Sequence, residues 1–274
     1  MNGNKVSVIK VGGSVLRDGV AYQDVATTLC REIQRGPTRV VVSAAEGVTD
    51  ALTRLAADGD QRIPGRLLQL HAELAGGPLP STVAADLQAA LAKARIGPQD
   101  SLVTWGERAS AAALQAWLSR AGFEAPIIEL GSPESSSPSL SAALTPGFYV
   151  RRDDGDVRCL PRGGSDLSAV LLAAGLGAPV VRLWKAGGGI RLNGGWVTQV
   201  SADALIPKLE DPIRPIHIGA LALASQLGID LLLEDPMERF PSTRIQAEPW
   251  RVGAFLPPWL GSPRGQLENA SQRA

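Results

Sequence analysis

The sequence contains few of the residues that build metal centres or disulfide frameworks. Among its 274 residues there are only two cysteines and two histidines. Cys30 and Cys159 lie far apart in the chain and match no zinc-ligand spacing. We therefore expect no protein-bound metal site, and we interpret both cysteines as reduced structural thiols of a cytoplasmic protein.

The chain also lacks net charge and long apolar runs. It has 27 basic and 27 acidic residues, so no overall field attracts it to nucleic acid or to an acidic membrane surface. The longest apolar runs, such as 168–175, are much shorter than the roughly 20 residues that span a bilayer. We expect neither a nucleic-acid nor a membrane partner, and any anion site must be local.

What the sequence does contain is an alternation of apolar strands and amphipathic helices. Residues 5–11 and 39–43 are rich in β-branched residues, as buried strands are. Between them, apolar side chains from Tyr22 to Ile33 recur at helical spacing, and Gly36-Pro37 ends the pattern. A strand, a helix and a strand within about forty residues predict a parallel βαβ unit.

The same patterns predict the remaining elements. Further helices are expected at 47–57, 66–75, 81–95, 100–121, 163–176 and 218–227. Further strands are expected at 125–130, 179–184 and 229–233, with a hairpin at 190–200. The chain is therefore predicted to be an α/β protein.

The first candidate site follows the first strand, in Val8-Ile9-Lys10-Val11-Gly12-Gly13-Ser14. A glycine turn exposes backbone N–H groups that suit a phosphate. Lys10 at the same edge could balance charge on a transferring phosphoryl group. The alternative is a tight turn with no ligand.

The second candidate is the segment 40–50, where small residues follow a strand and precede a helix. Ligands of open α/β sheets bind at such strand ends. Ser43 and Thr49 could donate hydroxyl hydrogen bonds to a carboxylate or a phosphate. The alternative for Thr49 is a helix cap.

The third candidate is Thr104-Trp105-Gly106-Glu107-Arg108-Ala109-Ser110. A glycine inside a helix costs about 1 kcal/mol relative to alanine, so Gly106 indicates close packing. Glu107 could pair with a substrate ammonium. The alternative is a surface pair between Glu107 and Arg108.

The fourth candidate is Pro161-Arg162-Gly163-Gly164-Ser165-Asp166, at the start of a predicted helix. Arg162 could grip a carboxylate through two parallel hydrogen bonds. Asp166 could orient Lys10 or hold a metal-bound water. The alternative for Asp166 is a charge favoured by the helix dipole.

In this order and spacing, the four motifs resemble those of the aspartokinases of the amino-acid kinase family. Residues 10–15 are similar to the family's opening Lys-Phe-Gly-Gly-Thr/Ser-Ser/Val. Residues 42–50 and 105–110 resemble its Val-Ser-Ala…Gly-Val-Thr-Asp/Asn and Phe-Gly-Glu-Arg/Leu-x-Ser segments. Residues 161–166 resemble its Gly-Arg-Gly-Gly-Ser-Asp, and Pro-Gly-Phe precedes that motif here as in the family. The resemblance extends from about residue 5 to residue 234.

The resemblance implies a three-layer αβα sandwich with a mainly parallel central sheet. We expect one kinase-like domain over residues 1–240, with a substrate-binding half over about 1–150 and a nucleotide-binding half over about 151–240. The polar loop at 131–142 is either a surface loop or a division between two lobes. Residues 241–274 are expected to form a partly disordered C-terminal extension, without the regulatory ACT domains of the family.

The resemblance also implies a function: ATP-dependent phosphorylation of the carboxylate of a small amino acid, such as aspartate, with Mg²⁺ and in a homodimer. Lys10 and Asp166 would act at the phosphoryl-transfer centre. The implied substrate-binding residues are Ser43, Thr49, Glu107, Arg162 and Ser165. The implied nucleotide-binding residues are Gly12, Gly13, Ser14, Gly163, Gly164, Lys185, Gly187, Gly188, Gly189 and Arg214. Since a carboxylate is already ionised at pH 7, this reaction needs positioning and charge balance rather than a general base.

The chain departs from the family pattern in the nucleotide-binding half. Ala186 and Gly188 stand at two positions that are acidic in aspartokinases. Arg214-Pro215-Ile216-His217 resembles the family's Lys-Val-Leu-His-Pro, with Arg214 at the lysine position. His217 is interpreted as a helix-start or packing residue.

Three functions are compatible with this pattern. In the first, the chain is an active kinase that holds the nucleotide through its phosphates and the glycine loop 187–189. In the second, it is a kinase for a different acid or a different nucleotide. In the third, it is a non-catalytic homologue that binds a small ligand and regulates a partner. We favour an active kinase, because the four charged residues of the motifs have little structural reason to occur together. These residues are Lys10, Glu107, Arg162 and Asp166.

Overall fold

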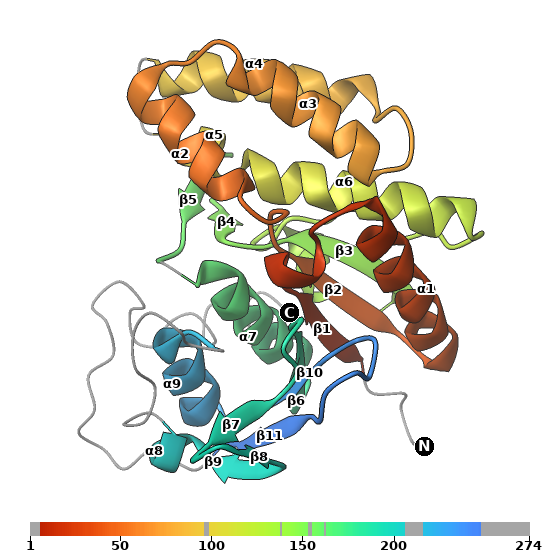
Figure 1. The fold of residues 1–274 in the computed structure, drawn as a ribbon, viewed down its shortest axis with the longest axis vertical. Coiled ribbons are helices and arrows are strands. Elements are labelled where there is room, and N and C mark those ends of the chain that lie inside the picture. The colour runs from red at the N-terminus through yellow and green to blue at the C-terminus, as the bar shows by residue number, and fades with distance from the viewer. Residues whose placement is uncertain are drawn as a thin grey trace.

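A seven-stranded sheet divides the protein into two helical layers (Figure 1). The structure is a computed structural model that describes residues 6–95, 99–137, 139–152, 155–161, 163–205 and 216–247. The strand order is β3-β2-β1-β6-β10-β11-β9. The first five of these strands run parallel, and β11 pairs antiparallel with β10. The strands are β1 (Ser7–Val11), β2 (Thr38–Val42), β3 (Ala142–Pro146), β6 (Val180–Trp184), β9 (Gln199–Ser201), β10 (Asp230–Glu234) and β11 (Thr243–Gln246).

One helical layer covers the first face of the sheet (Figure 1). Ile9 and Val11 of β1 point into the core that this layer forms. In this layer α1 (Gly19–Arg35) and α6 (Trp105–Arg120) lie beside the sheet (Figure 1). Four more helices pack against α6: α2 (Val48–Asp58), α3 (Ile63–Leu74), α4 (Ser81–Ala94) and α5 (Asp100–Val103). The short 3₁₀ turn η1 (Gly13–Val15) connects β1 to α1, and Asp18 caps α1 by accepting a hydrogen bond from the Ala21 N–H.

A second, smaller layer covers the opposite face. It contains α7 (Gly164–Leu176) and α9 (Ile218–Gln226), while α8 (Ala202–Leu205) follows β9. Val8 of β1 belongs to the core of this layer. Because side chains alternate along a strand, Lys10 is on the same face as Val8 and therefore on the α7 side. The predicted αβα arrangement with a mainly parallel sheet is confirmed.

Three minor elements complete the described fold. The 3₁₀ turn η2 (Pro133–Ser136) lies within the predicted polar loop. A hairpin pairs β4 (Tyr149–Arg151) with β5 (Val157–Cys159). A second hairpin pairs β7 (Ile190–Leu192) with β8 (Gly195–Val197), as the glycine turn predicts. None of the helices in the described part of the chain is long and apolar enough to cross a membrane.

The predicted strand at 125–130 is wrong. This segment makes only an isolated bridge between Ile127 and Leu144, and the position beside β2 belongs to β3. Pro126 has no N–H to donate. Every residue of β3 is buried, whereas the Glu129 carboxylate bonds to Tyr149 and Arg151 in the neighbouring hairpin.

Two other boundaries differ from the prediction. The single helix expected over 100–121 is divided at Thr104, where the Thr104 hydroxyl donates to the Asp100 carbonyl. The main sheet also extends into the region expected to be a C-terminal extension, because β11 pairs with β10 and β9. Residues 248–274 of that region lie outside the described residues.

Candidate functional site

The candidate site lies where the connections of the sheet change direction. From β1 the chain moves to β2 and β3 on one side, and it later returns to β6 and β10 on the other side. Ligands of open α/β sheets bind at the carboxyl ends of the strands at such a switch point. A cleft of about 560 Å³ opens here. It is lined by Lys10, Ser43, Ala44, Thr49, Asp50, Glu107, Phe148, Gly163, Gly164, Ser165, Asp166, Lys185, Ile216 and His217.

A cluster of two lysines and one aspartate lines the cleft; Lys10 and Asp166 are buried and Lys185 is partly buried. The Nζ atom of Lys10 lies 2.8 Å from Oδ1 of Asp166. The Nζ atom of Lys185 lies 3.2 and 3.3 Å from the two carboxylate oxygens of the same aspartate. The structure therefore brings together three predicted site residues from β1, α7 and the end of β6.

Burial and charge act in opposite directions on this cluster. Burial lowers the pKa of Lys10 to about 8, although the charge of Asp166 opposes this effect. Burial alone would raise the pKa of Asp166, but the charges of Lys10 and Lys185 outweigh it, so the pKa lies below its ordinary value. With both lysines protonated, the cluster has an excess of one positive charge, which suits an anionic ligand.

The start of α7 supplies further polar groups. Gly163 precedes the helix with φ 75°, in the left-handed region that favours glycine. A Cβ at Gly163 would lie 2.3 Å from the Cβ of His217, so only glycine allows this close approach. Ser165 and Asp166 follow in the first turn, where a helix presents free N–H groups and the positive end of its dipole.

The N-terminal part of α6 contributes Glu107 to the cleft. A Cβ at Gly106 would lie 2.7 Å from Cγ1 of Val48 and 3.0 Å from Cβ of Ala44, which explains the glycine inside this helix. The Ser110 hydroxyl accepts a hydrogen bond of 2.9 Å from the backbone N–H of Ala45. Gly106 and Ser110 thus fix α6 against the loop that follows β2.

Glu107 lies between these two contacts and lines the cleft. Its side chain is buried, and its Oε2 atom has no hydrogen-bond partner among the described residues. Burial raises the pKa of Glu107 to about 8, although backbone N–H groups of Glu107 and Ala44 partly oppose this effect. The alternative of a surface Glu107–Arg108 pair is excluded, because Arg108 pairs with Asp86 instead, at 2.7 Å.

The loop after β2 and the start of α2 contribute two further predicted residues to the cleft. Ser43 and Thr49 both line the cleft. Thr49 does not cap α2, because the N-cap is Gly47 with φ 77°. Asp50 also lines the cleft and is not among the predicted site residues.

Several predicted nucleotide-binding residues make structural contacts instead of lining the cleft. The N–H of Gly12 donates to the Trp184 carbonyl at 3.1 Å. A Cβ at Gly13 would lie 2.8 Å from the carbonyl oxygen of Ala44. The Ser14 hydroxyl accepts a hydrogen bond from the Ala186 N–H at 3.3 Å. These contacts hold the loops after β1 and β6 together.

The glycine loop after β6 is also engaged within the protein. A Cβ at Gly188 would lie 2.7 Å from Cβ of Phe240, and one at Gly189 would lie 2.4 Å from Oγ1 of Thr243. Gly187 has open space at the same position. Of the loop residues predicted to bind nucleotide, Lys185 alone lines the cleft. Arg162 and Arg214 lie outside the described residues.

Five residues that line the cleft were not predicted as site residues: Ala44, Asp50, Phe148, Ile216 and His217. The interpretation of His217 as a helix-start residue is confirmed, because its side chain accepts a hydrogen bond from the Gly219 N–H at the start of α9. Phe148 has a φ of 69°, which is unusual for a residue other than glycine. Its ring packs against Gly164, where a Cβ would lie 2.6 Å from the ring. The Pro146-Gly147-Phe148 segment was noted only for its position before the fourth motif.

Comparison with known proteins shows the family of the chain. The model of the Amino acid kinase family matches residues 5–210. The chain belongs to the amino acid kinase family. Among curated members of this family, the aspartokinase of Mycobacterium tuberculosis is 30% identical over 181 residues. That match covers 65% of this chain and 40% of the relative, so the chain spans well under half of the relative's length.

Solved structures of the family share the fold. Escherichia coli aspartokinase III in complex with aspartate and ADP superposes with a TM-score of 0.74 at 19% identity, covering 89% of this chain and 65% of that chain. The Clostridium acetobutylicum aspartate kinase gives a TM-score of 0.70 at 20% identity, covering 90% and 63%. Family membership and fold are thus established by sequence and structure together.

Proposed function

We propose that this chain transfers the γ-phosphoryl group of ATP to the carboxylate of a small amino acid, aspartate or a similar acid. The observation that carries the proposal is one cleft lined by two kinds of charged group. Lys10, Lys185 and the start of α7 supply positive groups, and the buried Glu107 supplies a carboxyl group. An amino acid offers a cation and an anion, and the nucleotide offers further anions.

Glu107 would bind the ammonium group of the substrate. The Oε2 atom of Glu107 is buried and unpaired, so it lacks the partner that a buried carboxylate needs. A substrate ammonium supplies that partner and lowers the pKa of Glu107, so this carboxyl group loses its proton when the substrate binds. Ser43 and Thr49 would donate hydroxyl hydrogen bonds to a substrate carboxylate nearby.

Lys10 and Lys185 would bring the substrate carboxylate and the γ-phosphate together. A substrate carboxylate oxygen attacks the γ-phosphorus, the bond from that phosphorus to the β,γ-bridging oxygen breaks, and an acyl phosphate and ADP result. No proton has to be removed from the nucleophile, so charge balance and alignment carry the catalysis. Lys10 and Lys185 would reduce the repulsion, and Asp166 would hold both ammonium groups in place.

The cleft fits Mg²⁺ only as an ion shared with the nucleotide. Within the described residues no group of three or more His, Cys, Asp or Glu side chains could hold a metal. Mg²⁺ in kinases takes one or two carboxylates together with phosphate oxygens and water. Asp50 would be the protein ligand, because both Asp166 oxygens are engaged with Lys10 and Lys185, and the ion would neutralise phosphate charge.

A second candidate function is that of a non-catalytic homologue that binds a small ligand and regulates a partner. The glycine loop favours it, because Gly188 and Gly189 pack against the segment 240–243 and two positions that are acidic in aspartokinases are Ala186 and Gly188. This homologue would keep the amino-acid site around Glu107 but would transfer no phosphoryl group.

A coupled assay of ADP formation separates the two. The acids to be tested are aspartate, glutamate and aminoadipate, each with ATP and Mg²⁺. The proposal predicts ADP formation that depends on one of these acids and is lost in Lys10→Ala, while Lys93→Ala, at an exposed surface lysine, retains it. If the folded wild-type chain gives no acid-dependent ADP, and calorimetry detects no ATP binding, the non-catalytic function is supported.

A further inference from the structure

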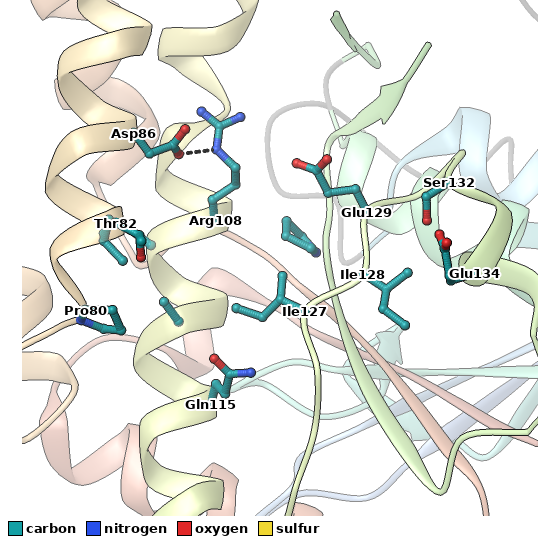
Figure 2. A pocket seen from close by; sticks show the side chains of 14 residues that line it. Pro80, Thr82, Asp86, Arg108, Gln115, Ile127, Ile128, Glu129, Ser132 and Glu134 are labelled. Atoms are coloured by element: carbon teal, nitrogen blue, oxygen red, sulfur yellow. Dashed lines mark hydrogen bonds and ion pairs between the residues drawn. The ribbon is translucent and has the colours of Figure 1, made fainter. Parts of the chain in front are cut away.

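A second cavity, of about 650 Å³, lies between α4, α6 and the segment 127–134 (Figure 2). None of its lining residues lines the catalytic cleft. Its volume is within the ~300–1,000 Å³ of typical small-molecule sites. It is therefore large enough for a ligand of its own.

The floor of this cavity is apolar. Val83 of α4, Ala109 and Ala112 of α6, Ile127 and Pro146 all line it. The small side chains of α6 leave the space open, since Ala109 and Ala112 present only methyl groups to it. Such a floor favours a ligand with an apolar body.

The charged groups of the cavity favour a cation. Three carboxylates line it, but Asp86 is paired with Arg108 and Glu129 with Arg151, which leaves Glu134 as the one without an ion pair to a described residue. Arg108 is already engaged, because its Nε donates to Asp86 at 2.7 Å and its Nη2 donates to the Ser101 carbonyl at 2.9 Å. An acidic ligand would therefore find no free guanidinium here.

One wall presents two groups that are not engaged with the described part of the chain. Figure 2 shows Ser132 and Glu134 next to each other on this wall. The Ser132 hydroxyl oxygen is buried and has no hydrogen-bond partner among the described residues. A buried hydroxyl without a partner is uncommon, because its desolvation is not repaid. Glu134 is exposed and forms no ion pair with a described residue, so its carboxylate is available beside this hydroxyl.

We propose that this cavity binds a small molecule with a protonated amine on an apolar body. The ammonium group donates hydrogen bonds to the Glu134 carboxylate and the Ser132 hydroxyl, and the apolar body lies on Ala109, Ala112 and Ile127. This site is separate from the proposed phosphoryl transfer and does not depend on it.

Three probes of one shape test the proposal on the full chain: 4-phenylbutylamine, 4-phenylbutanol and 4-phenylbutanoate. Calorimetry is expected to show saturable binding of the amine, with the alcohol and the carboxylate roughly tenfold weaker or more. Glu134→Gln weakens amine binding by about the same factor, and so does Ala112→Leu, whose larger side chain occupies part of the apolar floor. The matched control Glu124→Gln, at an exposed glutamate that does not line the cavity, binds the amine as wild type does.

Several outcomes would overturn the proposal. They are absence of saturable amine binding, equal binding of the three probes, and unchanged binding in Glu134→Gln and Ala112→Leu. Loss of binding in Glu107→Gln would place the amine in the catalytic cleft instead. A change of oligomeric mass in Ala112→Leu, measured by sedimentation, would show that a second copy of the chain covers the cavity. Circular dichroism confirms that each variant is folded.

Discussion

The Asp166 carboxylate joins two lysines that come from distant parts of the chain. Lys10 lies at 2.8 Å and Lys185 at 3.2 Å from the same oxygen, Oδ1. The aspartate and Lys10 are buried, and Lys185 is partly buried, so the charges of Lys10 and Asp166 depend on each other for their stability. This arrangement leads to the first prediction.

Asp166→Asn leaves the buried ammonium group of Lys10 and the partly buried one of Lys185 without this counter-ion. We expect it to lower the free energy of unfolding by about 3–5 kcal/mol at pH 7, because breaking a buried pair leaves an uncompensated charge. Phosphoryl transfer is expected to fall by a factor of 100 or more, since both lysines lose their alignment. Urea denaturation and the coupled assay measure the two effects. The matched variant Asp58→Asn, at an exposed residue, is expected to change neither; an equally stable Asp166→Asn protein would contradict the account.

The raised pKa of Glu107 predicts how stability depends on pH. Its pKa rises from an ordinary value near 4.5 in the unfolded chain to about 8 in the folded protein. Between these two pH values the folded state binds more protons at Glu107 than the unfolded chain does. The contribution of protonated Glu107 to the free energy of unfolding is therefore complete below about pH 4.5 and is lost as the pH rises through about 8. Glu107→Gln does not titrate. Its free energy of unfolding relative to wild type should rise by on the order of 1 kcal/mol per pH unit over this window. Urea denaturation of both proteins from pH 5 to pH 9 tests this, and a constant difference would show that Glu107 is not buried as described.

Ser110 is expected to act as a positioning residue, because its hydroxyl holds the Ala45 N–H in the loop that carries Ser43. Ser110→Ala leaves that N–H without a partner, which costs about 1–3 kcal/mol in stability. If the proposed function is correct, the KM for the acid should rise more than kcat falls, since the loop binds substrate. Ser119→Ala, at an exposed position of the same helix, is the control. A loss of stability without any change in KM would show that the hydrogen bond is purely structural.

The two glycines Gly106 and Gly65 should respond in opposite directions to alanine. A Cβ at Gly106 would meet Val48 at 2.7 Å, so Gly106→Ala is expected to cost about 1–3 kcal/mol through overpacking. Gly65 lies in α3 with open space around it, so Gly65→Ala should stabilise the protein by about 0.5–1 kcal/mol. Thermal unfolding of both variants measures the difference. Equal effects would contradict the docking of α6 against the loop after β2.

Much of the central fold was predictable because parallel strands have a strong local signal. The β-branched runs of β1, β2 and β6 lie where the sequence places them, since buried strands need apolar residues on both faces. The convergence of Lys10 and Asp166 follows from the same logic. Both lie at the mouth where strands end and helices begin, and the topology brings those ends together.

The edges of the sheet were less predictable. The segment 125–130 has strand-like residues, yet β3 takes the place beside β2, and the choice depends on tertiary contacts of Glu129 with Tyr149 and Arg151. The short strand β11 follows a proline-rich stretch and gains its stability from pairing with β10. The local sequence predicts neither the place of β3 beside β2 nor the pairing of β11 with β10.

The candidate site was predictable only where chemistry and position coincide. Lys10, Glu107 and Asp166 are charged residues at strand or helix ends, so the motifs identify them. The engagement of Gly188 and Gly189 with Phe240 and Thr243 depends on contacts some fifty residues apart in sequence, which no local pattern reveals.

The most direct test of the phosphoryl-transfer account is to trap its product. Hydroxylamine converts an acyl phosphate into a hydroxamate, which can be measured beside ADP in one reaction with aspartate, ATP and Mg²⁺. The account predicts equal amounts of hydroxamate and ADP from the wild-type chain and neither from Lys10→Ala. Formation of ADP without hydroxamate for every amino acid tested would contradict transfer to a carboxylate.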